Sequence, residues 1–179
     1  MKAFFAKMKG SGKGPPLPPL KDAAWSWFGA FLGMGAVGFM DSLLVAGTDL
    51  TLLIGSFGAS SVLLYAAPRS PLAQPRNLLG GHVLSALVGV AVRLCLPGPT
   101  WLACALAVAC AIALMQVTGT LHPPGGATAF IAVAGGPKIA ALGFTYALIP
   151  AGAGALVLLA VALLVNNLAE HRRYPEYWL

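Results

Sequence analysis

Acidic residues are scarce in this sequence, and their absence from its middle limits the chemistry available there. The chain of 179 residues holds 5 Asp and Glu in total, and none lies between Leu50 and Ala169. A metal site in that stretch would have no carboxylate ligand. Because buried charges are normally paired, cations in this stretch indicate either an anionic ligand or side chains that reach the lipid headgroups. These cations are Arg69, Arg76, Arg93 and Lys138.

Cysteine and charge are sparse as well. The three cysteines, Cys95, Cys104 and Cys110, lie in apolar segments without the spacing of metal ligands, so we expect them only to pack. Charged residues make up 9% of the chain, whereas a soluble domain carries about 25%. Hydrophobic residues make up 58%, and the mean hydropathy is +0.82. This composition indicates an all-α integral membrane protein with one membrane domain and no separate soluble domain.

Six apolar stretches organise the chain. We expect a flexible, basic, proline-rich tail over residues 1–22, a transmembrane domain over 23–169 and a short polar tail over 170–179. Two of the six stretches, Gly55–Ala67 and His122–Ala134, are too short for an ordinary span and predict broken or re-entrant helices. A turn is expected at Thr48–Asp49, and the last stretch should kink near Pro150. The other four stretches are about 23–46, 76–96, 101–118 and 139–168.

A weak internal repeat relates the two halves. A shift of 68 positions places Gly58-Ala59-Ser60 on Gly126-Ala127-Thr128, and the order of long and short segments also matches. The halves are then about 23–96 and 100–168, each with three membrane-entering segments. An odd number of segments per half predicts repeats of inverted topology, an arrangement common in transporters.

The basic residues predict the topology. If all six segments cross, the Lys-rich N-terminal tail, the Arg69–Arg76 connection, the loop near His122 and the C-terminal arginines share one side, with Lys138 the exception. Both termini would then be cytoplasmic, in a multi-pass protein of a bacterial inner membrane. The alternative has four true spans and two re-entrant helices.

The run from His122 to Thr128, His-Pro-Pro-Gly-Gly-Ala-Thr, is the first candidate site. Prolines suit the first turn of a helix, and Gly125 and Gly126 leave that turn without side-chain cover. Its N–H groups and positive dipole end would form an anion site, with His122 as a hydrogen-bond donor beside it and Thr128 one turn further on. A purely structural kink is the alternative. The residues assigned to this site are His122, Pro123, Pro124, Gly125, Gly126, Ala127 and Thr128.

Two further groups could complete the site. Arg76 presents a fork of donors suited to a small oxyanion, Asn77 follows it, and His82 lies one to two turns deeper on the same predicted helix. Ser56, Gly58 and Ser60 form the counterpart in the first half, where their hydroxyls could line a polar path. For the serines, bonding back to their own helix is the alternative, and for His82 it is a bond to a neighbouring carbonyl.

Three of these motifs resemble one known family. The run from His122 to Ala127, the stretch Phe57–Tyr65 and the stretch Ser70–His82 are similar to the HPP family of small integral membrane proteins. The similarity extends from about Trp25 to Val165. The resemblance implies membrane spans with few residues outside the membrane. Members in plastids and cyanobacteria are associated with nitrite transport, and some relatives carry regulatory CBS domains, of which this sequence has none.

These observations predict a transporter or channel for a small inorganic anion, with nitrite the first candidate. Two opposed short helices would direct their positive ends at a midplane site, Arg76 would attract anions, and His82 and His122 would tune the barrier. We expect a homo-oligomer in the lipid bilayer, with no cofactor, no metal, no nucleic acid and no enzymatic activity. One alternative is an intramembrane metal- or haem-binding protein or enzyme that uses His82 and His122. Another is a membrane scaffold without transport activity.

Overall fold

The computed structural model describes residues 1–8, 12–44 and 51–179, and these residues form helices with no β-strand among them. The turn expected at Thr48–Asp49 lies outside the described residues. Shorter turns join the main helices: π-helical turns at Val62–Ala66 and Leu148–Gly152, and 3-10 turns at Pro71–Ala73 and Gly143–Ala147. The main helices are α1 (Lys2–Lys7), α2 (Leu20–Leu44), α3 (Ser56–Ser61), α4 (Pro75–Cys95), α5 (Thr100–Val117), α6 (Pro123–Ala134), α7 (Gly136–Leu142) and α8 (Ala153–Leu168).

Prolines set where several helices begin. Pro75 and Pro123 each occupy a first-turn position, where the missing N–H has no helical partner to lose. The residue before each proline is extended: Gln74 has φ −70° and ψ 156°, and His122 has φ −137° and ψ 104°. The predicted kink near Pro150 is confirmed, because Ile149 leaves helical geometry with φ −134° and ψ 118°.

Helix length separates four long segments from two short ones. Within the described residues, Leu20–Leu44, Pro75–Cys95, Thr100–Val117 and Gly136–Leu168 are long and apolar enough to cross a membrane. The short pieces, Ser56–Ala66 and α6, are close to the predicted short helices. At about 1.5 Å per residue, the 12 residues of α6 reach about 18 Å, less than the roughly 30 Å of a bilayer core.

The described chain nevertheless runs between the two ends of the bundle six times. At the first end, the start of α2, residues 66–70 and residues 171–173 line one pocket, and residues 118–121 bond to the start of α4. At the second end, Leu52 bonds to Asp41, and Arg93, Thr100 and Gly136 line another pocket. The short helices therefore run in opposite directions, completed by non-helical residues, as the six-segment topology requires. The repeat relationship itself stays a prediction.

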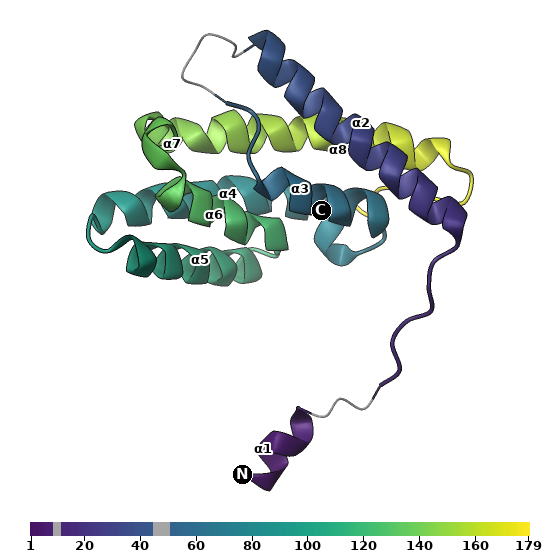
Figure 1. The fold of residues 1–179 in the computed structure, drawn as a ribbon, viewed down its shortest axis with the longest axis horizontal. Coiled ribbons are helices and arrows are strands. Elements are labelled where there is room, and N and C mark those ends of the chain that lie inside the picture. The colour runs from purple at the N-terminus through teal and green to yellow at the C-terminus, as the bar shows by residue number, and fades with distance from the viewer. Residues whose placement is uncertain (9–11, 45–50) are drawn as a thin grey trace.

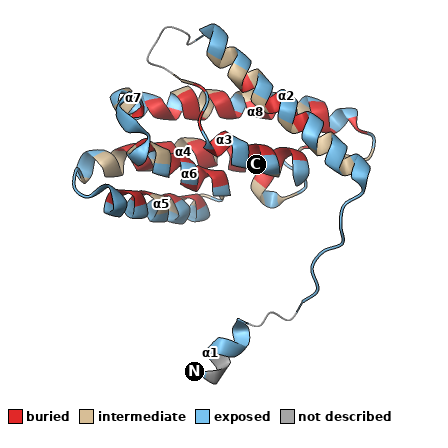
Figure 2. Ribbon diagram, viewed as in Figure 1, coloured by how far each residue is buried: buried red, intermediate tan, exposed pale blue. Residues whose placement is uncertain are grey.

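The helices pack as two groups, shown in Figure 1. α4, α5 and α6 pack against one another, while α2, α3 and α8 form the other group with the turn Val62–Ala66. Burial concentrates where α4, α6, α3 and α8 meet, and the outer faces of α2 and α5 are exposed (Figure 2). Exposed side chains there are apolar, including Trp27, Phe31 and Leu106, as expected for helices that face lipid.

Small residues allow α2 to approach its neighbours. Gly29 and Gly33 are buried against the ring of Tyr65, and a Cβ on Gly33 would clash with the Tyr65 hydroxyl. Small residues at such spacing let membrane helices approach closely, and here the ring of Tyr65 fills the space.

Candidate functional site

Five polar side chains form a hydrogen-bonded chain inside the protein, where the two helix groups meet. None is more than 1% exposed. Two of the side chains come from α3, one from α4, and two from the start of α6 and the residue before it. In order along the hydrogen-bonded chain they are His122, Ser60, His82, Thr128 and Ser56.

Ser60 lies at the centre of this chain. Its hydroxyl oxygen is 2.7 Å from Nε2 of His82 and 2.9 Å from Nε2 of His122. The two imidazole rings are 5.1 Å apart between centroids. The hydroxyl also lies 3.3 Å from the carbonyl of Ser56, one turn back on α3. Back-bonding to the helix, the alternative for the serines, therefore competes with the contacts to both histidines for the single hydroxyl hydrogen of Ser60.

Both nitrogens of His82 have partners. Nδ1 lies 2.7 Å from the Thr128 hydroxyl, which is 2.9 Å from the Ser56 hydroxyl. Phe57 packs edge-on against the imidazole, with ring centroids 5.1 Å apart. The weak repeat aligned Ser60 with Thr128, and these two residues bond to opposite nitrogens of the same ring. His82 is therefore fixed between α3 and α6.

Main-chain contacts hold His122 in place. Its Nδ1 lies 2.7 Å from the carbonyl oxygen of Leu72. The segment before it is tied to the first turn of α4: Arg76 donates to the carbonyl of Thr118 at 2.6 Å, and Asn77 donates to that of Leu121 at 2.9 Å. Arg76 and Asn77 thus position the broken segment, and the guanidinium of Arg76 also remains exposed.

The first turn of α6 is packed closely against α4. A Cβ on Gly125 would lie 2.8 Å from the carbonyl of Gly81, from Sδ of Met115 and from the hydroxyl of Ser85. The N–H of Gly125 donates to the carbonyl of His122 at 2.8 Å. Gly125 was expected to leave an N–H group accessible to an anion. Instead it allows two helices to pack in contact, and its N–H already has a partner. In this conformation the start of α6 is closed.

One arrangement of protons gives each histidine nitrogen a partner when both histidines are neutral. The Leu72 carbonyl can only accept, so Nδ1 of His122 carries the hydrogen and Nε2 accepts from Ser60. Ser60 then accepts from Nε2–H of His82, whose Nδ1 accepts from Thr128. Because Thr128 has one hydroxyl hydrogen, a bond donated to His82 in this arrangement competes with the bond that Thr128 donates to Ser56 at 2.9 Å.

One added proton on His122 reverses the direction of these bonds. With hydrogen on both its nitrogens, His122 donates to Ser60, and Ser60 donates to Nε2 of His82. Nδ1 of His82 then carries a hydrogen that it donates to Thr128, and Thr128 donates to Ser56. The geometry accommodates both arrangements without moving a heavy atom. This chain can therefore hold or pass a proton between its two ends.

Three of the residues assigned to the site lie away from this chain. Gly58, Pro123 and Ala127 are exposed. Pro123 and Ala127 line an apolar groove between α5 and α6 together with Met115 and Phe130. Helical geometry explains the separation, because residues one or two positions from Ser60, His122 and Thr128 point to other sides of their helices. Of the remaining residues, Pro124 and Gly126 are buried in the first turn of α6.

A metal would need a different arrangement of these side chains. Among the described residues, no three His, Cys, Asp or Glu side chains lie together. Both Nε2 atoms point at the Ser60 hydroxyl, so an ion shared by His82 and His122 would have to displace that hydroxyl.

Sequence reasoning missed two supports of the site. One is the carbonyl of Leu72, and the other is Tyr146, a fully buried residue whose hydroxyl donates to the carbonyl of Thr128 at 3.1 Å. A main-chain carbonyl leaves no trace in a sequence. A tyrosine in an apolar segment is a weak signal, because most aromatic residues in such segments only pack.

Known proteins match the chain over nearly its full length. The family described as HPP, transmembrane region, matches residues 15–175. A transmembrane protein of Dictyostelium discoideum is 45% identical over 180 residues, which cover 98% of this chain and 63% of that protein. A second transmembrane protein from Dictyostelium discoideum is 43% identical over 178 residues, 98% of this chain and 57% of its own length.

The chain therefore spans about three-fifths of the length of the curated relatives it matches. No solved structure matches it. The matched region includes all five members of the buried polar chain and every helix from α2 to α8. The protein is an integral membrane protein that belongs to the HPP family.

Proposed function

We propose that the protein moves a small inorganic anion across the membrane along the contact between α3 and α6, with nitrite the first candidate. The observation that carries the proposal is the chain from His122 through Ser60 to His82, buried where α4–α5–α6 meets α2–α3–α8. Burying polar side chains costs free energy, so a buried polar network in a membrane protein indicates a role in function or specificity. The association of HPP relatives with nitrite supports this choice of anion.

Charge supports an anion over a cation. No Asp or Glu lies between Leu50 and Ala169, so the interior offers hydroxyl and imidazole donors and no carboxylate. A cation would find few acceptors there beyond main-chain carbonyls and hydroxyls. A nitrite or similar oxyanion would accept hydrogen bonds from Ser56, Ser60 and Thr128, and from a protonated imidazole. Arg76, exposed at the first end, would raise the local anion concentration.

The structure corresponds to a closed state in this proposal. The donors of the buried chain bond to one another, so an anion can reach them only after α3 and α6 separate. The bonds of Ser60 to His82 and His122 join the two helix groups, and an anion that takes over the Ser60 hydroxyl would release both. A proton on His122 would supply the balancing charge. These features favour an alternating-access carrier over an open channel.

Orientation follows from the basic residues. Lys21, Arg69, Arg76, Arg172 and Arg173 lie at the first end, whereas Arg93 and Lys138 lie at the second. The excess supports a cytoplasmic position for the first end and, with it, for both termini. We propose the bacterial inner membrane as the location. We also propose a homo-oligomer, because the outer faces of α2 and α5 are apolar and exposed.

Flux into liposomes tests the proposal. The purified full chain would be reconstituted and assayed for uptake of nitrite, nitrate, formate, chloride and bicarbonate at two pH values, with protein-free liposomes as the control. We expect uptake of nitrite above the control, and stimulation by an inward proton gradient. Uptake of none of these anions would overturn the proposal.

Two competing functions give different results in the same preparation. A metal or haem protein would lose bound metal or absorbance on the His122→Ala substitution, whereas a carrier would lose flux and keep its assembly. A scaffold would show no flux in any variant. Neither alternative has an observation in its favour equal to the buried chain that joins the two helix groups.

A further inference from the structure

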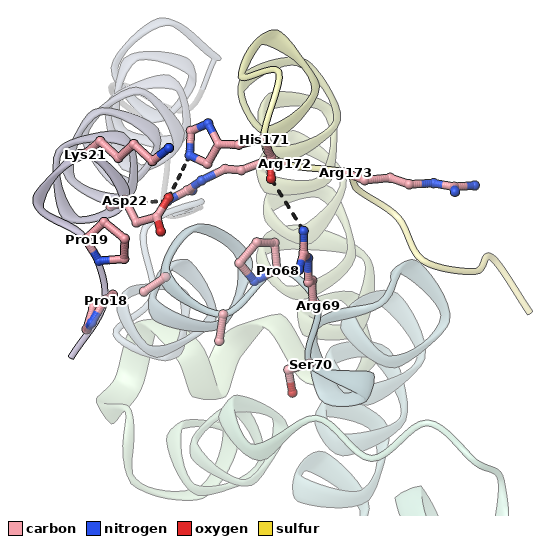
Figure 3. Close-up of a pocket in the computed structure, with 12 residues that line it drawn as sticks. Pro18, Pro19, Lys21, Asp22, Pro68, Arg69, Ser70, His171, Arg172 and Arg173 are labelled. Carbon is pink, nitrogen blue, oxygen red and sulfur yellow. Dashed lines mark hydrogen bonds and ion pairs between the residues drawn. The ribbon is translucent and has the colours of Figure 1, made fainter. Parts of the chain in front are cut away.

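A second polar site lies at the first end of the bundle, separate from His82 and His122. A pocket of about 760 Å³ is lined by the start of α2, residues 66–70 and residues 171–173. Figure 3 shows Lys21 and Arg69 reaching toward it from two different segments. Four of the side chains that line it are permanently cationic and one is a carboxylate.

The carboxylate is already neutralised. Asp22 lies 2.6 Å from Nε2 of His171 and 3.9 Å from Nη2 of Arg172. Arg172, with its side chain 7% exposed, also donates to the carbonyls of Tyr65 and Asp22 at 2.8 and 2.6 Å. Its donors are used by the protein, so Arg172 forms the floor of the pocket and is not a free binding group.

Two cations remain available. Among the described residues Lys21 has no ion-pair partner. Arg69, with a side chain 73% exposed, has only a 4.0 Å approach to Glu176 and a 3.4 Å bond to the carbonyl of His171. Arg173 lines the rim but points away from the other cations in Figure 3. Lys21, and Arg69 with only its long 4.0 Å pair to Glu176, therefore present positive charge to one space.

An apolar groove on α2 shares one lining residue, Lys21, with the basic pocket. Ala24, Trp25 and Phe28 of α2 line the rest of the groove. Trp25 and Phe28 pack edge-on with centroids 5.8 Å apart. Cations above an apolar groove at a membrane-facing helix match a phospholipid, whose phosphate and acyl chain need these two environments side by side. A soluble phosphate would use only the cations.

We propose that this pocket binds the phosphate headgroup of an anionic phospholipid, with Lys21 and Arg69 on the phosphate and Trp25 and Phe28 against an acyl chain. The site ties together the start of α2, residues 66–70 and the segment after α8. It does not depend on what the protein transports.

Lipid retention by the purified full chain tests this assignment. Phosphatidylglycerol, phosphatidylcholine and soluble glycerol phosphate would be added separately, and bound copies counted by native mass spectrometry. The test variant carries Lys21→Gln with Arg69→Gln, two exposed changes. The matched control carries Arg93→Gln with Lys138→Gln, which removes the same charge at the second end.

We expect the wild-type protein and the control to retain phosphatidylglycerol over phosphatidylcholine. The test variant should bind it at least tenfold more weakly, because each cation near a membrane surface contributes roughly fivefold. A Trp25→Ala variant should also weaken lipid binding without altering binding of glycerol phosphate. Equal retention by the test variant would overturn the proposal, as would equal binding of phosphatidylcholine. Binding of glycerol phosphate as tight as that of phosphatidylglycerol, and lost in the test variant, would assign the pocket to a soluble phosphate instead.

Discussion

His82 and His122 share one hydrogen-bonding partner, the hydroxyl of Ser60, which lies 2.7 Å from one Nε2 and 2.9 Å from the other. The two imidazoles come from different segments, and Ser60 comes from a third. A single oxygen therefore links α3 to α4 and to the residue before α6. This geometry makes Ser60 the most informative position to change.

Ser60→Ala should abolish anion uptake and destabilise the fold. It leaves two buried Nε2 atoms without their partner, at a cost of about 1–3 kcal/mol in the free energy of unfolding. Uptake into liposomes and thermal unfolding in detergent would measure the two effects, and Ser60→Thr should restore part of each.

Ser61→Ala is the matched control on the same helix. The Ser61 hydroxyl is buried with no hydrogen-bond partner among the described residues. Its removal should leave uptake unchanged and stabilise the protein by up to about 1 kcal/mol. Equal losses in the two variants would mean that any change in α3 disables the protein, against the role given to Ser60.

Gly125→Ala should destabilise the first turn of α6. The new Cβ would lie 2.8 Å from main-chain and side-chain atoms of α4 and from Met115, so the helices must separate at a cost of about 1–3 kcal/mol. Gly126→Ala is the neighbouring control, because its Cβ would meet only Val108, at 3.8 Å. In thermal unfolding, Gly125→Ala should have a lower midpoint temperature than both the wild-type protein and Gly126→Ala. The opposite ranking would contradict the packing described for α6.

Tyr174→Phe should loosen the segment after α8. The Tyr174 hydroxyl donates to the carbonyl of Ala73 at 2.8 Å and is buried, so its loss should cost about 1 kcal/mol. Tyr177→Phe is the control, because Tyr177 is exposed and its 3.2 Å bond to Pro71 should contribute little. Limited proteolysis after α8 and thermal unfolding would report the difference.

Tyr174 should also make the stability of the protein fall at high pH. Burial, followed by the neighbouring Tyr65, raises the pKa of Tyr174 above its ordinary value. An unfolded tyrosine ionises near pH 10, so the stabilisation from Tyr174 is complete below about pH 10 and is lost as the pH rises further. Between about pH 9 and pH 11 the wild-type protein should therefore lose more stability than Tyr174→Phe. An identical loss in both would show that Tyr174 stays accessible to water.

The sequence predicted the parts of this site that depend on local chemistry. Prolines at 123 and 124 required a helix start, and the run from His122 to Thr128 is where two members of the buried chain lie. Asn77 and His82 were assigned to the site from one predicted helix, and both are buried on α4. Helix periodicity makes such placements predictable once the helix is recognised.

Other parts depended on tertiary contacts with no local pattern. Nothing in the sequence indicates that Leu72 offers its carbonyl to His122, or that Arg172 would bond to the start of α2. The start of α2 at Leu20, three residues before the predicted boundary, reflects this contact, since Arg172 bonds to the carbonyl of Asp22. The closed first turn of α6 likewise depends on Gly81 and Ser85 of another helix, which meet Gly125 across the contact.

The most direct test of the central claim asks whether Ser60 lies on the path of the anion. Cys95, Cys104 and Cys110 would be replaced by alanine, and Ser60→Cys compared with Ser61→Cys in liposomes that carry out nitrite uptake. We predict that a small anionic thiol reagent modifies the thiol at position 60 during turnover, that modification stops uptake, and that nitrite slows it, while position 61 is not modified. Continued nitrite uptake with an unmodified thiol at position 60 would contradict the account.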